Sequence, residues 1–552
     1  MTAPASYDGG RGTAATSPSG DGPARPGARV LRIVVLAAVF VCAACGLVYE
    51  LSLVTLGSYL LGNTITQTSL VLAVTMFAMG VGAVAAKPLL GRPLRAFVTV
   101  ELALAVVGGF AVPVLYGAFS WLSIYTPAML VVTFAIGLLV GAEIPLLMAL
   151  LQHLRRQDAA RAVADINAVD YVGALVGGLA FPFLLLPLFG LLEGSLVVAA
   201  VNVVAAAVVA VALGRRARTR GPLLAAVAAC VVVALALGLM AWRASAFEAT
   251  AQQALYRDPI VHSERSDYQS IVVTRGWVAG AEYDDVRLYL DGDLQFSSVD
   301  EYRYHEMLVH PALDGPRGRV LVLGGGDGLA LREVLAYDDV EEVTLVDLDP
   351  AVVDLARTYE PITRLNEGAW EDPRVSYVSA DAFGWARDRA DQLAEGDGPE
   401  GDAPYDAIVV DYPDPDSPAL AKLYSVEHYR TLAGLLADDG RMVVQSGSPF
   451  FAPDAFWCVR RTLAEAGFST TPYHADVPSF GDWGFVIATP AGTPAATPGL
   501  GAGAPDDLRY ASPEMLAAAT VFPPDRQDRA GDVSTLLDPA ILRYSQQEWV
   551  GY

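Results

Sequence analysis

Long apolar runs fill the first half of this chain and limit what it can fold into. From Val30 to Trp242 such runs recur, and each is close to the roughly 20 residues that an α-helix needs to cross the hydrocarbon core of a bilayer. The sequence therefore predicts a multi-pass helical membrane bundle of about seven helices. We place these helices near residues 30–51, 68–86, 97–119, 128–151, 171–188, 194–213 and 223–240.

Charge divides the chain at about Arg243. Up to that residue there are 15 Lys and Arg and 9 Asp and Glu, whereas beyond it there are 22 and 52, so an apolar and mildly basic half precedes a strongly acidic one. Strong acidity argues against a nucleic-acid partner, which would need a basic surface. It fits a cationic substrate, and it also fits simple solubility.

Composition and pattern suggest the domain limits. Residues 1–28, rich in Gly, Ala, Pro, Ser and Thr, lack the apolar side chains of a core and are expected to be disordered. Residues 29–243 form the predicted transmembrane domain. Short alternating strands in 244–315 predict a small β-rich subdomain, and 316–490 predicts a Rossmann-like, methyltransferase-like α/β domain. Residues 491–552 are expected to be a linker and C-terminal tail.

A glycine turn stands at the start of the predicted α/β domain, between a strand and a helix. It runs from Gly324 to Gly328, and Asp347 ends the next strand about 20 residues on, where a carboxylate can accept hydrogen bonds from ribose hydroxyls. Asp381 and Ala382 follow the third strand, from which a carboxylate and a backbone amide can contact an adenine edge. Ligands of such sheets bind at the carboxyl ends of the strands, so these residues predict an adenosyl site.

Five motifs follow one another in order through the second half. They are Tyr268-Gln269; Leu290-Asp291-Gly292 with Gln295; the heptapeptide from Asp300 to Glu306; the glycine turn with Leu331-Arg332-Glu333-Val334; and Asp411-Tyr412-Pro413-Asp414-Pro415. From Tyr268 to about Ala488 the chain therefore resembles the spermidine-synthase family of polyamine aminopropyltransferases. The membrane half resembles the transmembrane extension of a bacterial branch of that family.

The resemblance implies transfer of an aminopropyl group from decarboxylated S-adenosylmethionine to an amine, with putrescine as the expected acceptor and spermidine and methylthioadenosine as products. The donor is a co-substrate, and neither a true cofactor nor a metal is expected. An ammonium must lose a proton before it attacks, so a general base is needed. The resemblance gives this catalytic role to Asp411, assisted by Asp414. Asp327 would repel the carboxylate of ordinary S-adenosylmethionine.

The same resemblance assigns the binding residues. Those expected to bind the methylthioadenosine part of the donor are Gln269, Gly324, Gly326, Asp347, Asp381, Ala382 and Pro418. Those expected to bind the amine are His305, Asp327, Asp411, Asp414, Tyr302 and Trp483. Tyr412 and Pro413 stand where small hydroxyl residues are usual in the family, so spermidine and cadaverine remain alternative acceptors, and a homodimer or other homo-oligomer is left open.

Two other functions stay open. One is a methyltransferase that uses ordinary S-adenosylmethionine. The other is a polyamine transporter or sensor whose second half only binds ligand, which is suggested by Glu50, Glu101 and Glu143 because acids within membrane helices are costly. Cys42 and Cys45 share a helix face without further Cys or His nearby, and we expect them to be packing residues.

Lys and Arg at the helix ends predict the orientation of a protein in the cell membrane. They gather before the first predicted helix and after the second, fourth and sixth, whereas the intervening turns carry none. Basic loops stay in the cytoplasm, so an odd number of helices would put the second half outside. The donor is made in the cytosol, and we therefore predict a cytoplasmic catalytic domain. This location requires one membrane crossing more or one fewer than seven. We expect the miscounted crossing within 30–62, where Glu50 interrupts the apolar run.

Overall fold

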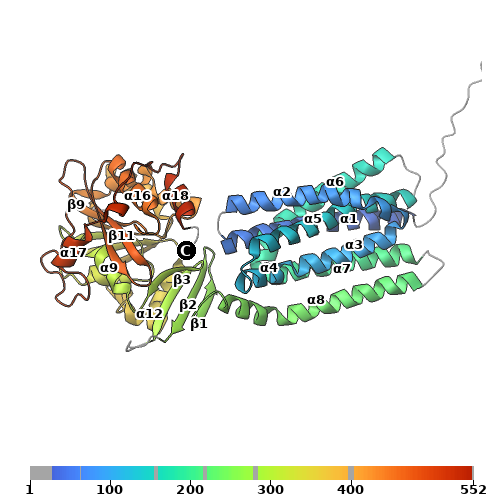
Figure 1. The fold of residues 1–552 in the computed structure, drawn as a ribbon, viewed down its shortest axis with the longest axis horizontal. Helices are drawn as coiled ribbons and strands as arrows, with labels where there is room; N and C mark the ends of the chain where they lie inside the picture. Colours follow the sequence, from blue (N-terminus) through green and yellow to red (C-terminus); the bar gives the residue numbers. More distant parts are fainter. Residues whose placement is uncertain are drawn as a thin grey trace, which may run out of the picture. The chain divides into compact units, whose positions relative to one another are not determined.

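The chain forms two compact units. A computed structural model describes residues 28–61, 64–154, 159–215, 221–277, 284–395 and 403–549. The units are Met1–Ala251 and Gln252–Tyr552, and the boundary between them in the chain falls in the last turn of a long helix that continues past the predicted limit at Arg243 (Figure 1). Of the predicted disordered segment 1–28, all but Ala28 lies outside the described residues, as do the arginines at 155, 156, 216, 218 and 220.

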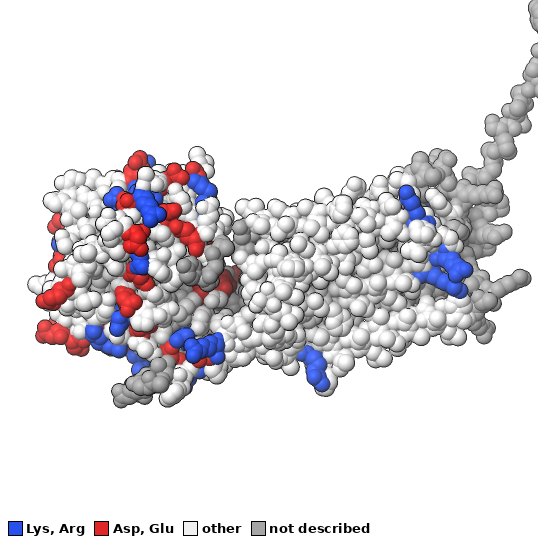
Figure 2. Space-filling model, viewed as in Figure 1, with Lys and Arg blue, Asp and Glu red and all other residues white. Residues whose placement is uncertain are grey.

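The first unit consists of α-helices. Many of their outward side chains are large and apolar, among them Met76, Val131 and Leu235, which are each more than two-thirds exposed. Figure 2 shows a nearly uncharged surface along these helices, with most of the visible Lys and Arg gathered at one end. The elements are α1 (Ala28–Leu61), α2 (Thr64–Ala85), η1 (Lys87–Gly91), α3 (Pro93–Gly109), α4 (Ala111–Ser120), α5 (Tyr125–Leu154), α6 (Ala159–Ala180), η2 (Phe181–Leu185), α7 (Leu186–Gly214) and α8 (Gly221–Gln253).

Small residues bring these helices together. A Cβ atom on Gly82 of α2 would lie 2.0 Å from the carbonyl oxygen of Leu138, and one on Gly141 of α5 would lie 2.1 Å from that of Met79. Neither position has room for a larger residue. Such close backbone contact is how helices gain packing energy in an apolar medium, where no hydrophobic effect drives them together.

Six helical stretches in the described part of the chain are long and apolar enough to cross a membrane, where about seven were predicted. The difference arises in Val163–Gly214, a 52-residue stretch that contains both predicted helices 171–188 and 194–213. Gly190 breaks it with a non-helical φ of 65°. The predicted miscount within 30–62 was wrong, since α1 continues through Glu50 to Leu61 as one helix.

The second unit contains two sheets. The smaller sheet is antiparallel in the order β1-β2-β3-β4 and corresponds to the predicted β-rich region. The larger sheet has the order β10-β11-β9-β8-β5-β6-β7, in which β9, β8, β5, β6 and β7 are parallel and β11 lies antiparallel between β10 and β9. The strands are β1 (Ile260–Arg265), β2 (Ser270–Gly276), β3 (Asp285–Leu290), β4 (Asp293–Ser297), β5 (Arg319–Gly324), β6 (Glu342–Asp347), β7 (Val375–Ser379), β8 (Tyr405–Asp411), β9 (Leu436–Gln445), β10 (Ser469–Val477) and β11 (Gly481–Thr489).

Buried apolar runs explain the parallel strands. Val320–Leu323 of β5 is fully buried, as parallel strands covered on both faces require. The helices of this unit are α9 (Glu301–Val309), α10 (Leu329–Leu335), α11 (Pro350–Thr358), α12 (Glu360–Leu365), η3 (Ala369–Glu371), α13 (Ala382–Glu395), α14 (Pro418–Ala421), η4 (Lys422–Tyr424), α15 (Val426–Ala433), α16 (Pro453–Ala466), α17 (Pro513–Ala519), η5 (Pro524–Arg526) and α18 (Ala540–Glu548). The last three belong to the predicted tail, and α18 packs against α16.

Candidate active site

Four neighbouring parallel strands end on polar or glycine residues that meet at one edge of the sheet. These residues are Asp347 of β6, Gly324 of β5, Asp411 of β8 and Gln445 of β9. The strand order reverses between β5 and β8, which is where doubly wound sheets bind their ligands. Three of these four residues were predicted from the sequence.

Gly324 pairs in register with Asp411 across the two central strands. Its φ is 84°, and a Cβ atom there would lie 2.1 Å from the carbonyl oxygen of Asp411, so no other residue fits. The following Gly325 would place a Cβ atom 3.2 Å from Oδ2 of Asp411. The glycine turn therefore lies directly against the carboxylate of Asp411.

Asp411 is held by a residue that the sequence analysis missed. The hydroxyl of Tyr304, on α9, donates a hydrogen bond of 2.5 Å to Oδ1 of Asp411. Burial raises the pKa of Asp411, while the charge of His305 and the bond from Tyr304 lower it. Tyr302 was predicted from the sequence instead. Residues two apart on a helix point in different directions. The centre of the Tyr302 ring lies 3.6 Å from the guanidinium carbon of Arg509.

Asp327, in the glycine turn, is partly buried beside two charged groups. Its Oδ1 accepts a hydrogen bond of 2.9 Å from the backbone N–H of Leu329. Burial raises the pKa of Asp327 to about 6; the charge of His305 opposes this rise and that of Asp411 adds to it. Asp327, His305 and Asp411 therefore form one electrostatic cluster, as predicted for residues of a shared site.

His305 belongs to a buried ion-pair network. Its Nδ1 lies 2.8 Å from the carbonyl oxygen of Glu301 and 3.0 Å from Oε2 of the same residue, and Arg332 forms two hydrogen bonds of 3.0 Å with that carboxylate. Burial alone would lower the pKa of His305, but the bond and charge of Glu301 outweigh it and raise the pKa to about 9. His305 is therefore protonated at neutral pH.

Gln445, a second missed residue, connects Asp414 to two aromatic side chains. Its Nε2 donates to Asp414 Oδ1 at 3.3 Å and to the hydroxyl of Tyr424 at 2.7 Å. Its Oε1 accepts a bond of 3.3 Å from the indole N–H of Trp483. Burial raises the pKa of Asp414 to about 7; the Gln445 bond opposes the rise, and the charges of nearby Asp293 and Asp416 add to it.

The predicted donor residues on the β6 side also lie together. Asp347 accepts hydrogen bonds from the backbone N–H groups of Gly326, at 3.1 Å, and Asp349, at 2.9 Å. The side chain of Gln269 donates to Asp349 at 3.0 Å. Burial raises the pKa of Asp347 to about 6, against the effect of these backbone bonds. Asp349 was not predicted.

The remaining predicted donor residues border the same edge of the sheet. Asp381 follows β7, is about half exposed and forms an ion pair of 2.9 Å with Lys422. Ala382 is the first residue of α13. Pro418 is the first residue of α14, whose N-terminus is capped by Ser417.

The C-terminal tail, to which sequence analysis gave no role, reaches this site. A small cavity beside Asp414 is lined by Tyr424 and Gly447 and, from the tail, by Ile541, Ser545 and Trp549. Two further contacts hold the tail there. The side chain of Gln546 donates a hydrogen bond of 3.2 Å to the carbonyl oxygen of Asp416. The carboxylate of Glu548 accepts hydrogen bonds of 3.1 Å each from the backbone N–H groups of Asp454 and Ala455, at the start of α16.

Comparison with known proteins identifies the family of this chain. The spermine/spermidine synthase domain model matches residues 301–496. Polyamine aminopropyltransferase 1 of Streptomyces coelicolor is 56% identical over 530 residues, which cover 96% of this chain and 97% of that protein. The polyamine aminopropyltransferase of Mycobacterium tuberculosis is 47% identical over 527 residues, covering 94% and 97%.

A solved structure is also similar. It is a spermidine synthase in complex with the transition-state analogue AdoDATO, 25% identical, with a TM-score of 0.40, and the match covers 48% of this chain and 85% of that one.

Proposed function

The chain belongs to the polyamine aminopropyltransferase family and is a transferase of aminopropyl groups, and on that premise we propose decarboxylated S-adenosylmethionine as its donor and putrescine as its acceptor. The observation that carries the proposal is the carboxylate of Asp411, which lies partly buried against the glycine turn at the point where the strand order reverses. An acid in this position serves a reaction that must deprotonate an amine beside an adenosyl group.

Asp411 is the proposed general base. Tyr304 occupies its Oδ1, while Oδ2 is next to Gly325. Asp411 takes one proton from the ammonium of the acceptor, and the freed nitrogen attacks the carbon next to the sulfonium. A C–N bond forms, the C–S bond breaks with its electron pair going to sulfur, and methylthioadenosine leaves. The product is spermidine when the acceptor is putrescine.

Asp327 is the proposed selector of the donor. Its carboxylate lies in the glycine turn, next to His305 and Asp411. An ionised carboxylate at this position attracts the free amine of the decarboxylated donor and repels the carboxylate that ordinary S-adenosylmethionine carries. A methyltransferase would gain nothing from an acid here.

His305 has a different proposed role from the one that we assigned from the sequence. A protonated imidazole bound to Glu301 repels an ammonium, so direct contact with the amine is unfavourable. Its positive charge lowers the pKa of both Asp327 and Asp411. We assign His305 to positioning: it keeps these two acids ionised within a buried site.

Asp414 keeps both of its proposed roles, assistance to Asp411 and binding of the amine, and Trp483 keeps its role at the amine. Asp414 and Trp483, joined through Gln445, are assigned to the far end of the amine, which the acid attracts and the indole covers. Tyr302, covered by Arg509, keeps only a peripheral role at the amine site. The proposed donor residues are Gln269, Gly324, Gly326, Asp347, Asp381, Ala382 and Pro418.

A donor and acceptor panel tests the function. The full-length protein in detergent is incubated with decarboxylated or ordinary S-adenosylmethionine and with putrescine, cadaverine or spermidine, and methylthioadenosine is measured. Fastest release with the decarboxylated donor and putrescine is expected. Asp411→Asn, which nearly preserves shape, should lower turnover by about 10²-fold or more. Methyl transfer from the ordinary donor, or near-normal turnover of Asp411→Asn, would contradict the proposal.

The first unit is proposed to lie in the cell membrane. Its six long apolar stretches and its large exposed apolar side chains support insertion in a bilayer. A straight helix of 52 residues would be about 78 Å long, more than twice the hydrocarbon thickness, yet both α6 and α7 pack against α1. Val163–Gly214 therefore turns back near Gly190 and crosses twice, which makes seven crossings in the proposed arrangement.

A further inference from the structure

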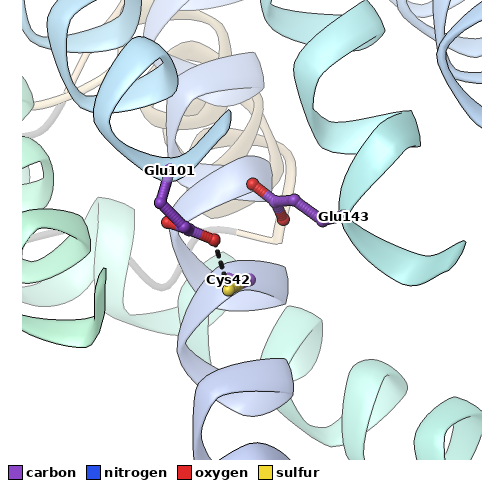
Figure 3. Close-up of side chains that lie close together, drawn as sticks. All are labelled: Cys42, Glu101 and Glu143. Carbon is purple, nitrogen blue, oxygen red and sulfur yellow. Dashed lines mark hydrogen bonds between the residues drawn. The ribbon is translucent and has the colours of Figure 1, made fainter. Parts of the chain in front are cut away.

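Three side chains with metal-binding atoms converge inside the helical unit. Cys42 on α1, Glu101 on α3 and Glu143 on α5 each offer a sulfur or oxygen atom, and these atoms all lie within 4.8 Å of one another. The Cys42 Sγ donates a hydrogen bond of 2.7 Å to Glu101 Oε1, and Glu143 points toward both (Figure 3). Cys42 was predicted to be a packing residue because no further Cys or His lies near it along the chain.

One carboxylate oxygen on each acid of this cluster lacks the partner that its burial demands. Glu101 is 0% exposed and Glu143 is 3% exposed. Oε2 of Glu101 and Oε1 of Glu143 accept no hydrogen bond from any described residue. Within the described ranges no Lys or Arg pairs with either acid, whereas Asp165 of the same unit is paired with Arg32 at 2.6 Å. Two ionised carboxylates buried side by side are strongly unfavourable, so this pair must either hold a proton or bind a cation.

We propose that Cys42, Glu101 and Glu143 bind a transition-metal ion of the zinc class, which joins α1, α3 and α5. A thiol with two carboxylates suits zinc, which accepts sulfur and oxygen ligands in small coordination numbers. Calcium and magnesium instead prefer more ligands, all of them oxygen. Binding releases the thiol proton to solvent, and the thiolate and both carboxylates then face a divalent charge.

The geometry is close to what such an ion requires. Ligand atoms at about 2.0–2.3 Å from a tetrahedral ion lie roughly 3.3–3.8 Å apart. The observed spread of up to 4.8 Å exceeds this by about 1 Å, a gap that rotation of the long, unbranched Glu side chains can close. Three protein ligands leave one coordination position for water. Because the ligands come from three helices, bound metal should stabilise the helical unit.

Metal titration of the full-length protein in detergent tests the site. The protein is stripped with a chelator, dialysed against Zn²⁺ or against Co²⁺, and analysed for bound metal, for the thiolate-to-cobalt absorption band and for the melting temperature. We expect one ion per chain, a thiolate band and a higher melting temperature. Cys42→Ser, Glu101→Gln and Glu143→Gln should each weaken binding by about tenfold or more.

Matched controls come from the same helix. Cys45→Ser changes a buried thiol one turn from Cys42 that hydrogen-bonds the carbonyl of Val198, and Glu50→Gln changes an acid outside the cluster; both should bind metal as the unchanged protein does. No uptake by the stripped protein, or equal uptake by Cys42→Ser and Cys45→Ser, overturns the proposal. If the Gln variants do not fold, the comparison of the two nearly isosteric Ser variants still decides it. Aminopropyl transfer is not a readout here, so failure of the proposed function and failure of this site are distinguishable.

Discussion

The hydroxyl of Tyr304 and the carboxylate of Asp411 are joined by a hydrogen bond of 2.5 Å between residues 107 positions apart in the chain. The bond occupies one oxygen of Asp411 and orients the other relative to the glycine turn. It also lowers the pKa of Asp411 against the opposite effect of burial. Tyr304 therefore both aims the proposed base and helps to keep it ionised.

Tyr304→Phe should lower turnover by about tenfold or more, since a hydrogen bond to a charged group is removed while the ring stays. Loss of the bond raises the pKa of Asp411, so the rise of turnover with pH should shift to higher pH. The measurement is turnover as a function of pH. Tyr302→Phe, two residues away under Arg509, is the matched control and should leave the profile unchanged; a shift in the control alone would reject the assignment.

Asp327→Asn should reduce discrimination between the two donors. Removal of the charge takes away both the partner of the donor's amine and the repulsion of a carboxylate, so the ratio of binding constants should fall by about tenfold or more. The ratio is measured by calorimetry without acceptor. Asp338→Asn, on an exposed position in the same unit, should not alter it. An unchanged ratio in Asp327→Asn would mean that this residue only shapes the turn.

We predict that the ionisation of Asp414 makes the affinity for the acceptor amine depend on pH. Its pKa of about 7 means that the site gains its negative charge as the pH rises through 7, so the KM for putrescine should fall by up to about tenfold per pH unit toward that value. Asp414→Asn should have a high KM that hardly changes between pH 6 and 8. A KM that still falls with pH in Asp414→Asn would assign the titration to another group.

The raised pKa of Asp414 also determines how this residue affects protein stability as the pH changes. Folded Asp414 holds its proton more tightly than in the unfolded chain, where an Asp pKa is about 3.9. The contribution of this group to the free energy of unfolding therefore decreases as the pH rises from about 4 to about 7 and stays low above it. Denaturation at several pH values should show a smaller decrease in Asp414→Asn.

Strands and turns could be predicted because their causes are local. The helix predicted after the glycine turn is present as α10 (Leu329–Leu335), since the turn precedes it and an apolar pattern defines it. Asp347 and Asp411 could be placed at strand ends for the same reason. The motif sequence then indicated the family, which comparison with known proteins confirmed.

The missed residues depend on contacts between distant segments. Gln445 ends β9 as Asp411 ends β8, but only the strand order puts the two ends side by side. Tyr304 and Tyr302 are equally plausible in the sequence, and only the docking of α9 chooses between them. Cys42 has no ligand near it in the chain because Glu101 and Glu143 come from other helices.

We predict that Trp549 influences which amine the enzyme prefers as acceptor. It follows α18, lines the cavity beside Asp414 and stacks on Phe451 at 5.7 Å between ring centres. Trp549→Ala should enlarge the cavity and raise kcat/KM for spermidine relative to putrescine by several-fold, whereas Trp549→Phe should retain the original ratio. Equal ratios in both variants and in the unchanged protein would show that the tail only stabilises α16.

The side of the membrane on which the catalytic unit lies can be decided by reporter fusions. We predict the cytoplasm, because the donor is made there and a cationic sulfonium does not cross a bilayer unaided. The Lys and Arg gathered at one end of the helical unit (Figure 2) support the opposite orientation: if that end is cytoplasmic, seven crossings would put Gln253 outside.

A reporter enzyme active only outside the cell and a fluorescent protein that matures only in the cytoplasm are each fused after Gln253 and after Tyr552. Fluorescence without enzyme activity at both positions is the expected result, and it would require an even number of crossings or an N-terminus outside the cell. Enzyme activity at both positions would reject the prediction, and the donor would then need a route across the bilayer, for which Glu50, Glu101 and Glu143 would be the first residues to substitute.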